Sequence, residues 1–182
     1  MFLIVLSLVF SVSHSMVMIQ IPSDAVVNKS AAIVQGSVIG KTSQKEHGGV
    51  IFTYYTFKLA DDGNIKNSNI AQTITIKTIG GKVGKEILDV TGFPVLINGA
   101  EYILFLEERG NTNYDIYGAN QGCMKAFLAT KEGTNEKQKM LRPCENKYFN
   151  AVYLEQVGIE LAPKKAVRLD DFIKKVKGYQ SK

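Results

Sequence analysis

The chain has 182 residues, 45% of them apolar, which is enough to bury one sizeable core and favours a single main domain. Its formal net charge of +5 arises in residues 164–182, because residues 1–163 contain equal numbers of basic and acidic side chains. A neutral body with a basic end argues against a nucleic-acid-binding barrel, whose groove would itself be basic.

An uncharged apolar run opens the chain up to Phe10, and small or polar residues follow it. This order is typical of a secretory leader and predicts cleavage after Ser13 or Ser15, and therefore an exported chain, secreted or periplasmic. The alternative is an uncleaved anchor over residues 1–21, close to the ~20 residues that a bilayer requires. The polar His14 near the middle of that stretch favours the leader, which we place at residues 1–15.

Strand patterns fill most of the chain after a short helix predicted over residues 23–30, where Ser23 offers an N-cap. β-Branched, aromatic or alternating residues predict the strands, and glycines within them predict bends. The predicted strands cover residues 31–40, 50–59, 71–79, 86–90, 102–106, 113–118 and 124–129. The turn residues 61–64 are expected to end the second strand, and the polar residues 131–147 are expected to form a solvated loop. The segment 102–106 is apolar on both faces, which predicts a central strand.

The last predicted element is an amphipathic helix that starts near Asp170 and stops at Gly178. Its apolar stripe follows helical spacing and consists of Leu169, Phe172, Ile173 and Val176. We expect the stripe to pack on the rest of the protein, with an anionic membrane surface or a partner protein as alternatives. The candidate contact residues on this helix are Lys174, Lys175 and Lys177.

The number and spacing of the strands, with glycine at corners, predict an all-β fold: a small barrel of about five main strands with a short N-terminal and a C-terminal helix. A β-sandwich is the alternative. The barrel domain is expected over residues 16–163, followed by the basic helical segment 164–182.

Cys123 and Cys144 are the two cysteines of the chain. In an exported protein an even number favours a disulfide, and closing this ~20-residue loop would add roughly 3 kcal/mol of stability. The alternative is that the two cysteines are unrelated buried thiols. This alternative is favoured if the prediction of a leader is wrong. Two cysteines with no nearby histidine cannot form a structural zinc site.

Several strand and turn patterns resemble, in the same order, those of a group of exported bacterial proteins of unknown function that carry a small β-barrel. These patterns are Ala31-Ala32-Ile33-Val34-Gln35-Gly36-Ser37-Val38, Gly81-x-Val83-Gly84, Val90-x-Gly92-x-Pro94 and Asn98-Gly99-x-Glu101-Tyr102-Ile103-Leu104-Phe105-Leu106. The layout is also similar to the netrin-like domain, an oligomer-binding-type barrel shared with tissue inhibitors of metalloproteinases. The resemblance covers roughly residues 25–130 and implies the fold. Those inhibitors chelate the target's zinc with an N-terminal cysteine, and this chain has no cysteine before Cys123.

Motifs of catalysis and of cofactor binding are missing from the sequence. His47 is the one histidine beyond the leader, and no nucleophile-elbow pattern accompanies it. The glycines Gly80 and Gly84 are one residue too close for a phosphate-binding loop, and Glu86 stands where that motif has Ser or Thr. We therefore expect no enzyme activity, cofactor or metal.

Tyrosines are the remaining candidates for a binding face, foremost Tyr54, Tyr55 and Tyr102, with Tyr114 and Tyr117 as further members of the same patch. Adjacent strand residues face opposite sides, so one of the first two is expected to point outward; half-buried structural tyrosines are the alternative. The function expected is a non-enzymatic exported binding protein that contacts another secreted or envelope protein, with protease inhibition as one form of that contact. The alternative is an envelope-associated accessory protein held at the membrane surface by its basic tail, and an unrecognised enzyme is the third.

Overall fold

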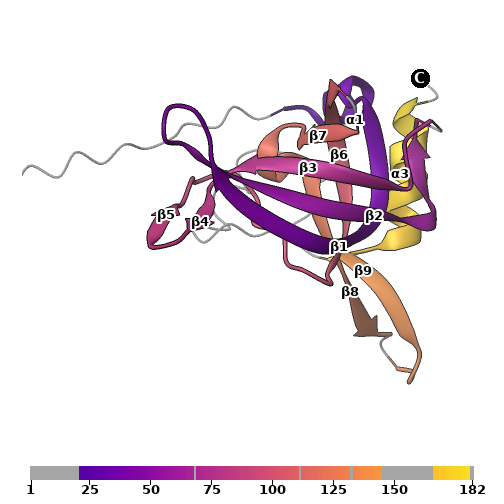
Figure 1. The fold of residues 1–182 in the computed structure, drawn as a ribbon. Coiled ribbons are helices and arrows are strands. Elements are labelled where there is room, and N and C mark those ends of the chain that lie inside the picture. The colour runs from indigo at the N-terminus through magenta and orange to yellow at the C-terminus, as the bar shows by residue number, and fades with distance from the viewer. Residues whose placement is uncertain (1–20, 68, 111, 132, 145–165, 181–182) are drawn as a thin grey trace, which may run out of the picture.

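The computed structural model describes residues 21–67, 69–110, 112–131, 133–144 and 166–180, so the expected leader lies outside the described residues. The chain forms a closed five-stranded barrel in the order β1-β2-β3-β7-β6, closed by a second pairing of β1 with β6 (Figure 1). The barrel strands are β1 (Ala32–Lys45), β2 (Ile51–Lys66), β3 (Thr73–Ile79), β6 (Glu101–Gly110) and β7 (Asn113–Ile116). Neighbours run antiparallel except β3 and β7, which are parallel. The all-β barrel is confirmed, and it is consistent with an oligomer-binding-type barrel.

Further strands extend this sheet from β6: β8 (Cys123–Thr130), β9 (Lys137–Pro143) and the short β10 (Val167–Arg168). A separate hairpin of β4 (Gly81–Val83) and β5 (Glu86–Leu88) lies at one end of the barrel (Figure 1). The prediction of a loop over 131–147 is wrong for β9, which pairs with β8 from Met124↔Pro143 to Thr130↔Lys137. The sequence pattern did not indicate this strand, because its residues are mostly polar and Leu141 is its one buried residue.

Irregular pairing bends β1 and β2 around the barrel. The register between them shifts on both sides of Gly36, where an added Cβ would lie 2.2 Å from the carbonyl oxygen of Lys58. The pairing moves from Gly36↔Leu59 to Val34↔Asn64, so residues 60–63 form a bulge within β2, and the predicted turn residues 61–64 do not end the strand. The glycine predicted to mark a bend does so.

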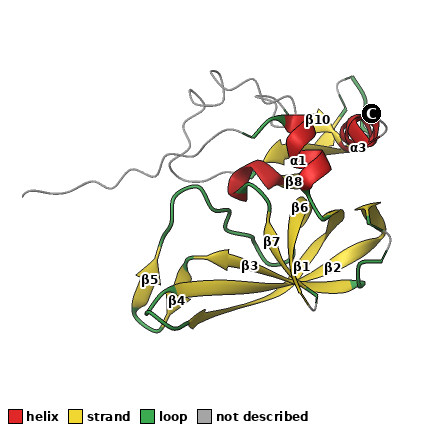
Figure 2. Cartoon of the chain, turned by 90° about the horizontal axis from the view of Figure 1, so that it is seen from above, coloured by secondary structure: helices red, strands yellow, loops and turns green. Residues whose placement is uncertain are grey.

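A second apolar layer covers the outer side of β1 and β6. It brings together α1 (Ser23–Lys29), α3 (Leu169–Gln180), β8 and β9, and its fully buried centre includes Ile33, Ile103 and Phe105. The Phe172 ring of α3 meets the Phe105 ring edge-on at 6.3 Å. The predicted packing of the α3 stripe is confirmed, and Figure 2 shows both helices on the same side of the barrel.

Both helix ends differ in detail from the prediction. Pro22 is the N-cap residue of α1 and no side chain caps it, whereas Ser23 is already helical. Gly178 does not stop α3, which continues to Gln180. Within the described ranges, no helix has the length and apolar character needed to span a bilayer.

Lys66, near the end of β2, caps the C-terminus of α1. Its Nζ donates hydrogen bonds to the carbonyl oxygens of Val27 (2.8 Å), Asn28 (2.8 Å) and Ser30 (2.7 Å). A cation at this end of a helix satisfies free carbonyls and complements the helix dipole. Burial lowers the pKa of the Lys66 ammonium. This lysine ties the N-terminal helix to the barrel.

The predicted disulfide between Cys123 and Cys144 is present, with 5.4 Å between the Cα atoms. It joins the start of β8 to the end of β9, and Cys123 is fully buried in the barrel interior. A disulfide is compatible with an oxidising, exported environment.

Candidate functional site

The β4–β5 hairpin and the segment 88–95 enclose a cleft of about 740 Å³ at one end of the barrel, which we call the mouth cleft. Its inner wall carries hydroxyl groups from β1, β2 and β3, namely Ser43, Thr53, Tyr55 and Thr78. Ser43 Oγ and Thr53 Oγ1 share a hydrogen bond of 2.8 Å, and Thr53 Oγ1 donates to the carbonyl oxygen of Gly80 at 2.7 Å. This part of the wall is therefore polar, and Lys41 of β1 adds a charged side chain to the lining of the cleft.

Gly81 allows the hairpin to approach this wall closely. Its φ is +138°, and a Cβ at this position would lie 2.3 Å from Thr53 Oγ1. Any other residue would push the hairpin away from the barrel and open the cleft. The glycine-dense turn at residues 80–84 is thus explained by the geometry of the cleft.

Tyr55 and Tyr102 point into the barrel and hold the segment that lies across its end. Each is only 2% exposed. The hydroxyl oxygen of Tyr55 accepts a hydrogen bond from the backbone N–H of Leu96 at 3.3 Å, and that of Tyr102 accepts one from Ile97 at 2.9 Å. Burial raises the pKa of both phenols. Both tyrosines fix the backbone of the segment 93–97.

The segment 93–97 alternates between inward and outward side chains. Pro94 and Leu96 are buried, whereas Val95 is 70% and Ile97 is 53% exposed. Ile87 of β5, which lines the mouth cleft together with Val95, is also exposed. These three residues, which we call the aliphatic rim, were missed by the sequence reasoning. The alternation between the turns at Gly92 and Gly99 was the available signal.

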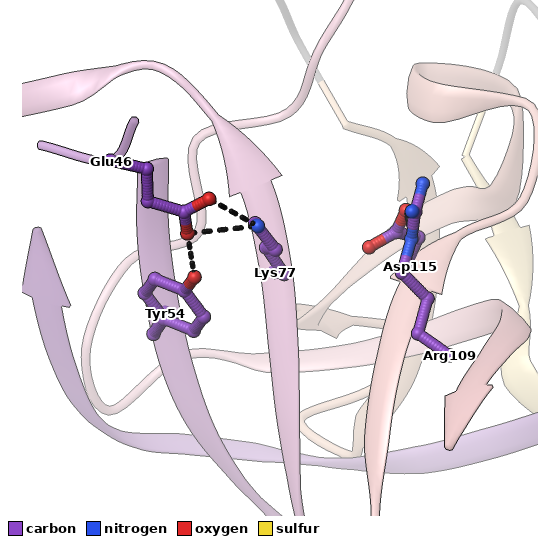
Figure 3. Close-up of polar contacts among 5 residues, drawn as sticks. All are labelled: Glu46, Tyr54, Lys77, Arg109 and Asp115. Atoms are coloured by element: carbon purple, nitrogen blue, oxygen red, sulfur yellow. Dashed lines mark hydrogen bonds and ion pairs between the residues drawn. The ribbon is translucent and has the colours of Figure 1, made fainter. Parts of the chain in front are cut away.

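Tyr54 lies on the opposite side of β2 from Tyr55, as the two-residue strand period predicts. Its hydroxyl donates a hydrogen bond to Glu46, which also accepts from Lys77 Nζ at 3.0 Å (Figure 3). The hydrogen bond from Lys77, followed by that from Tyr54, lowers the pKa of the Glu46 carboxyl. The same contact with Glu46 raises the pKa of Lys77. Tyr54 therefore belongs to a charged network on the outside of the barrel.

The three lysines singled out on the last helix, Lys174, Lys175 and Lys177, are exposed on α3. Figures 1 and 2 both place α3 away from the β4–β5 hairpin. The structure therefore does not bring these lysines and the tyrosines into one site. A role of any of these side chains in binding stays a prediction.

Among the described residues, no group of three His, Cys, Asp or Glu side chains is arranged to hold a metal ion.

Comparisons of the chain with models of protein families, with curated proteins and with solved structures found no match. The candidate site is therefore defined by its own geometry: a polar cleft beside an exposed aliphatic rim on a fixed backbone.

Proposed function

We propose that this chain is an exported, non-enzymatic binding protein that contacts another secreted or envelope protein through its aliphatic rim. The observation that carries the proposal is the outward display of Val95 and Ile97 on a backbone held by two buried tyrosine hydroxyls. Aliphatic side chains at such exposure are in contact with water, and covering them is favourable. Clustered exposed apolar residues commonly mark protein interaction sites.

Rigidity of the segment 93–97 favours tight binding. A segment that is already fixed loses little conformational entropy when a partner binds it. Alternating outward side chains also suit an extended segment that enters a partner's cleft, which is how a protease would be inhibited. The strand order and the glycine patterns support a scaffold similar to the netrin-like domain, and the Cys123–Cys144 disulfide supports export.

The test is capture of a partner from native secreted and envelope fractions by the full chain and by the V95D/I97D double variant. We expect the wild-type protein to capture one partner in a defined ratio. The double variant should lose at least about 100-fold in affinity, because charges placed at the centre of an apolar contact remove two anchors.

Leu128→Asp is the matched control, since Leu128 is 64% exposed on β8 and lies outside the rim. This variant should bind like the wild-type protein. Unchanged circular dichroism and melting temperature establish that the variants are folded. Equal capture by V95D/I97D and wild type would overturn the proposal.

A second candidate, attachment to an anionic membrane surface, is favoured by the exposed Lys174, Lys175 and Lys177 on α3. Because the apolar stripe of α3 packs on the barrel, such attachment would be electrostatic. Sedimentation with phosphatidylserine vesicles, and release by salt, tests it. Binding that persists after all three lysines are changed to Gln would exclude this role of the helix.

A further inference from the structure

A second hollow, of about 660 Å³, lies on the outer wall of the barrel where β3, β7 and β6 run side by side, and we call it the wall groove. The strand register places Lys77 of β3 beside Asp115 of β7, and Asp115 beside Glu107 of β6. All three point outward: the neighbours of Lys77 and Asp115 along their strands are buried in the barrel, and Glu107 follows the buried Leu106 and pairs with Asp115. One row of charged side chains therefore forms the floor of the groove.

Lys77 does not neutralise Asp115, although the two lie side by side. Its Nζ is 2.8 Å and 3.0 Å from the two carboxylate oxygens of Glu46 and 4.0 Å from the centre of the Phe52 ring. Figure 3 shows the lysine turned toward Glu46 and Tyr54, on the side away from Asp115. The lysine charge is thus compensated within its own network.

Asp115 uses one carboxylate oxygen and leaves the other without a donor. Arg109 Nε donates to Asp115 Oδ2, while Oδ1 is buried and has no hydrogen-bond partner. A buried acceptor without a donor is unfavourable, and a ligand that donates to it removes this cost. In the described part of the chain no ion pair involves Glu107, which is exposed. The groove therefore has one uncompensated negative charge and one free buried acceptor.

The walls of the groove are apolar and partly aromatic, formed mainly by Phe52, Ile79 and Phe93. A ligand that fits must combine a positive charge, several N–H donors and a surface that tolerates aromatic contact. A guanidinium group has all three, since it is planar, carries five N–H donors and stacks on aromatic rings. An ammonium group is a compact, strongly hydrated charge and does not stack in this way.

We propose that the wall groove binds a guanidinium group, namely an arginine side chain of a peptide or protein. In the bound state the Glu107 carboxylate accepts its N–H groups, the Phe93 ring flanks it, and a shift of the exposed Arg109 side chain gives it access to Asp115 Oδ1. This inference does not rest on the proposed function, because the aliphatic rim contributes none of the accepting atoms.

The test is titration of the isotope-labelled full chain with N-acetyl-arginine methylamide, followed by amide chemical shifts. We expect saturable shifts at Glu107, Arg109 and Asp115, and weaker binding of N-acetyl-lysine methylamide. Glu107→Gln should weaken arginine binding about five-fold, as expected for loss of one exposed charge pair. The V95D/I97D variant should bind arginine unchanged, so failure at one site is distinguishable from failure at the other.

Glu108→Gln is the matched control, because it removes the same charge one residue away, on the opposite side of β6. It should leave arginine binding unchanged. The proposal is overturned if the shifts do not saturate, if both Gln variants weaken binding equally, or if the lysine derivative binds as tightly as the arginine derivative. Glu107 is exposed, so its variant is expected to fold; the amide spectrum reports this directly.

Discussion

The barrel has one wall that is covered and one that faces solvent. On the wall of β1 and β6, the outward residues Ile33, Ile103 and Phe105 are buried under α1 and α3. On the wall of β2, β3 and β7, outward residues such as Thr75 and Lys77 are partly exposed. The first wall contributes a second apolar core, and the second, together with Glu107 and Arg109 at the end of β6, carries the wall groove. The second apolar core and the proposed arginine site thus lie on two different sides of one barrel.

The largest expected difference between the walls is in how far the free energy of unfolding falls when a phenylalanine is changed to alanine. Phe105→Ala on the covered wall should lower the free energy of unfolding by about 3–5 kcal/mol, since it leaves a cavity against Phe172. Phe52→Ala on the solvent-facing wall should cost about 1 kcal/mol or less, because Phe52 is only partly buried. Urea unfolding measures both, and equal losses would show that the walls do not differ in this way.

The disulfide provides a second, smaller test of the covered wall, because it closes the β8–β9 pair that extends this wall. Reduction should lower the free energy of unfolding by about 3 kcal/mol, as expected from the conformational freedom that the unfolded chain regains. Thermal melts with and without reductant measure this. The C123A/C144A variant is the control, and its melting temperature should not respond to reductant.

The smallest expected effect is on the solvent-facing wall and depends on pH. Because hydrogen bonds from Lys77 and Tyr54 lower the pKa of Glu46 in the fold, the ionised carboxylate stabilises the protein above the unfolded pKa. This contribution is lost as the pH falls below 4.5, the ordinary value, through the lowered pKa. Glu46→Gln should therefore be slightly destabilising at ~pH 7, and its effect should shrink progressively as the pH falls below 4.5.

Urea unfolding at a series of pH values from neutral into the acidic range measures the Glu46→Gln effect. A Glu46→Gln penalty that does not shrink as the pH falls below 4.5 would contradict the lowered pKa.

The barrel strands could be predicted because their residue patterns reflect what covers each face. In β3, Ile74 and Ile76 alternate with polar residues, as in a strand with one wet face. Residues 102–106 are continuously apolar because β6 is buried on both faces, and its central position is confirmed. The strand β9 could not be predicted, because it owes its conformation to hydrogen bonds with β8 and not to its own polar side chains.

The candidate site could be predicted only in part. The strand period gave the opposite directions of Tyr54 and Tyr55. The partner of the Tyr55 hydroxyl is 41 residues away at Leu96, and the partner of Lys77 is 31 residues away at Glu46. Such contacts depend on barrel closure and on the register of β2 and β3, in which Tyr54 pairs with Lys77, and no local pattern encodes them.

Tyr55 and Tyr102 hold the segment 93–97 from inside the barrel, and the side chains at positions 87, 95 and 97 are exposed, so we expect the fold to tolerate changes at these three positions. Folding and surface chemistry are therefore separable at this end of the molecule. That separation is what a combinatorial display library requires. Randomising these three positions would diversify the surface while the barrel and its disulfide remain constant, so the chain is suited to the selection of binders against new targets.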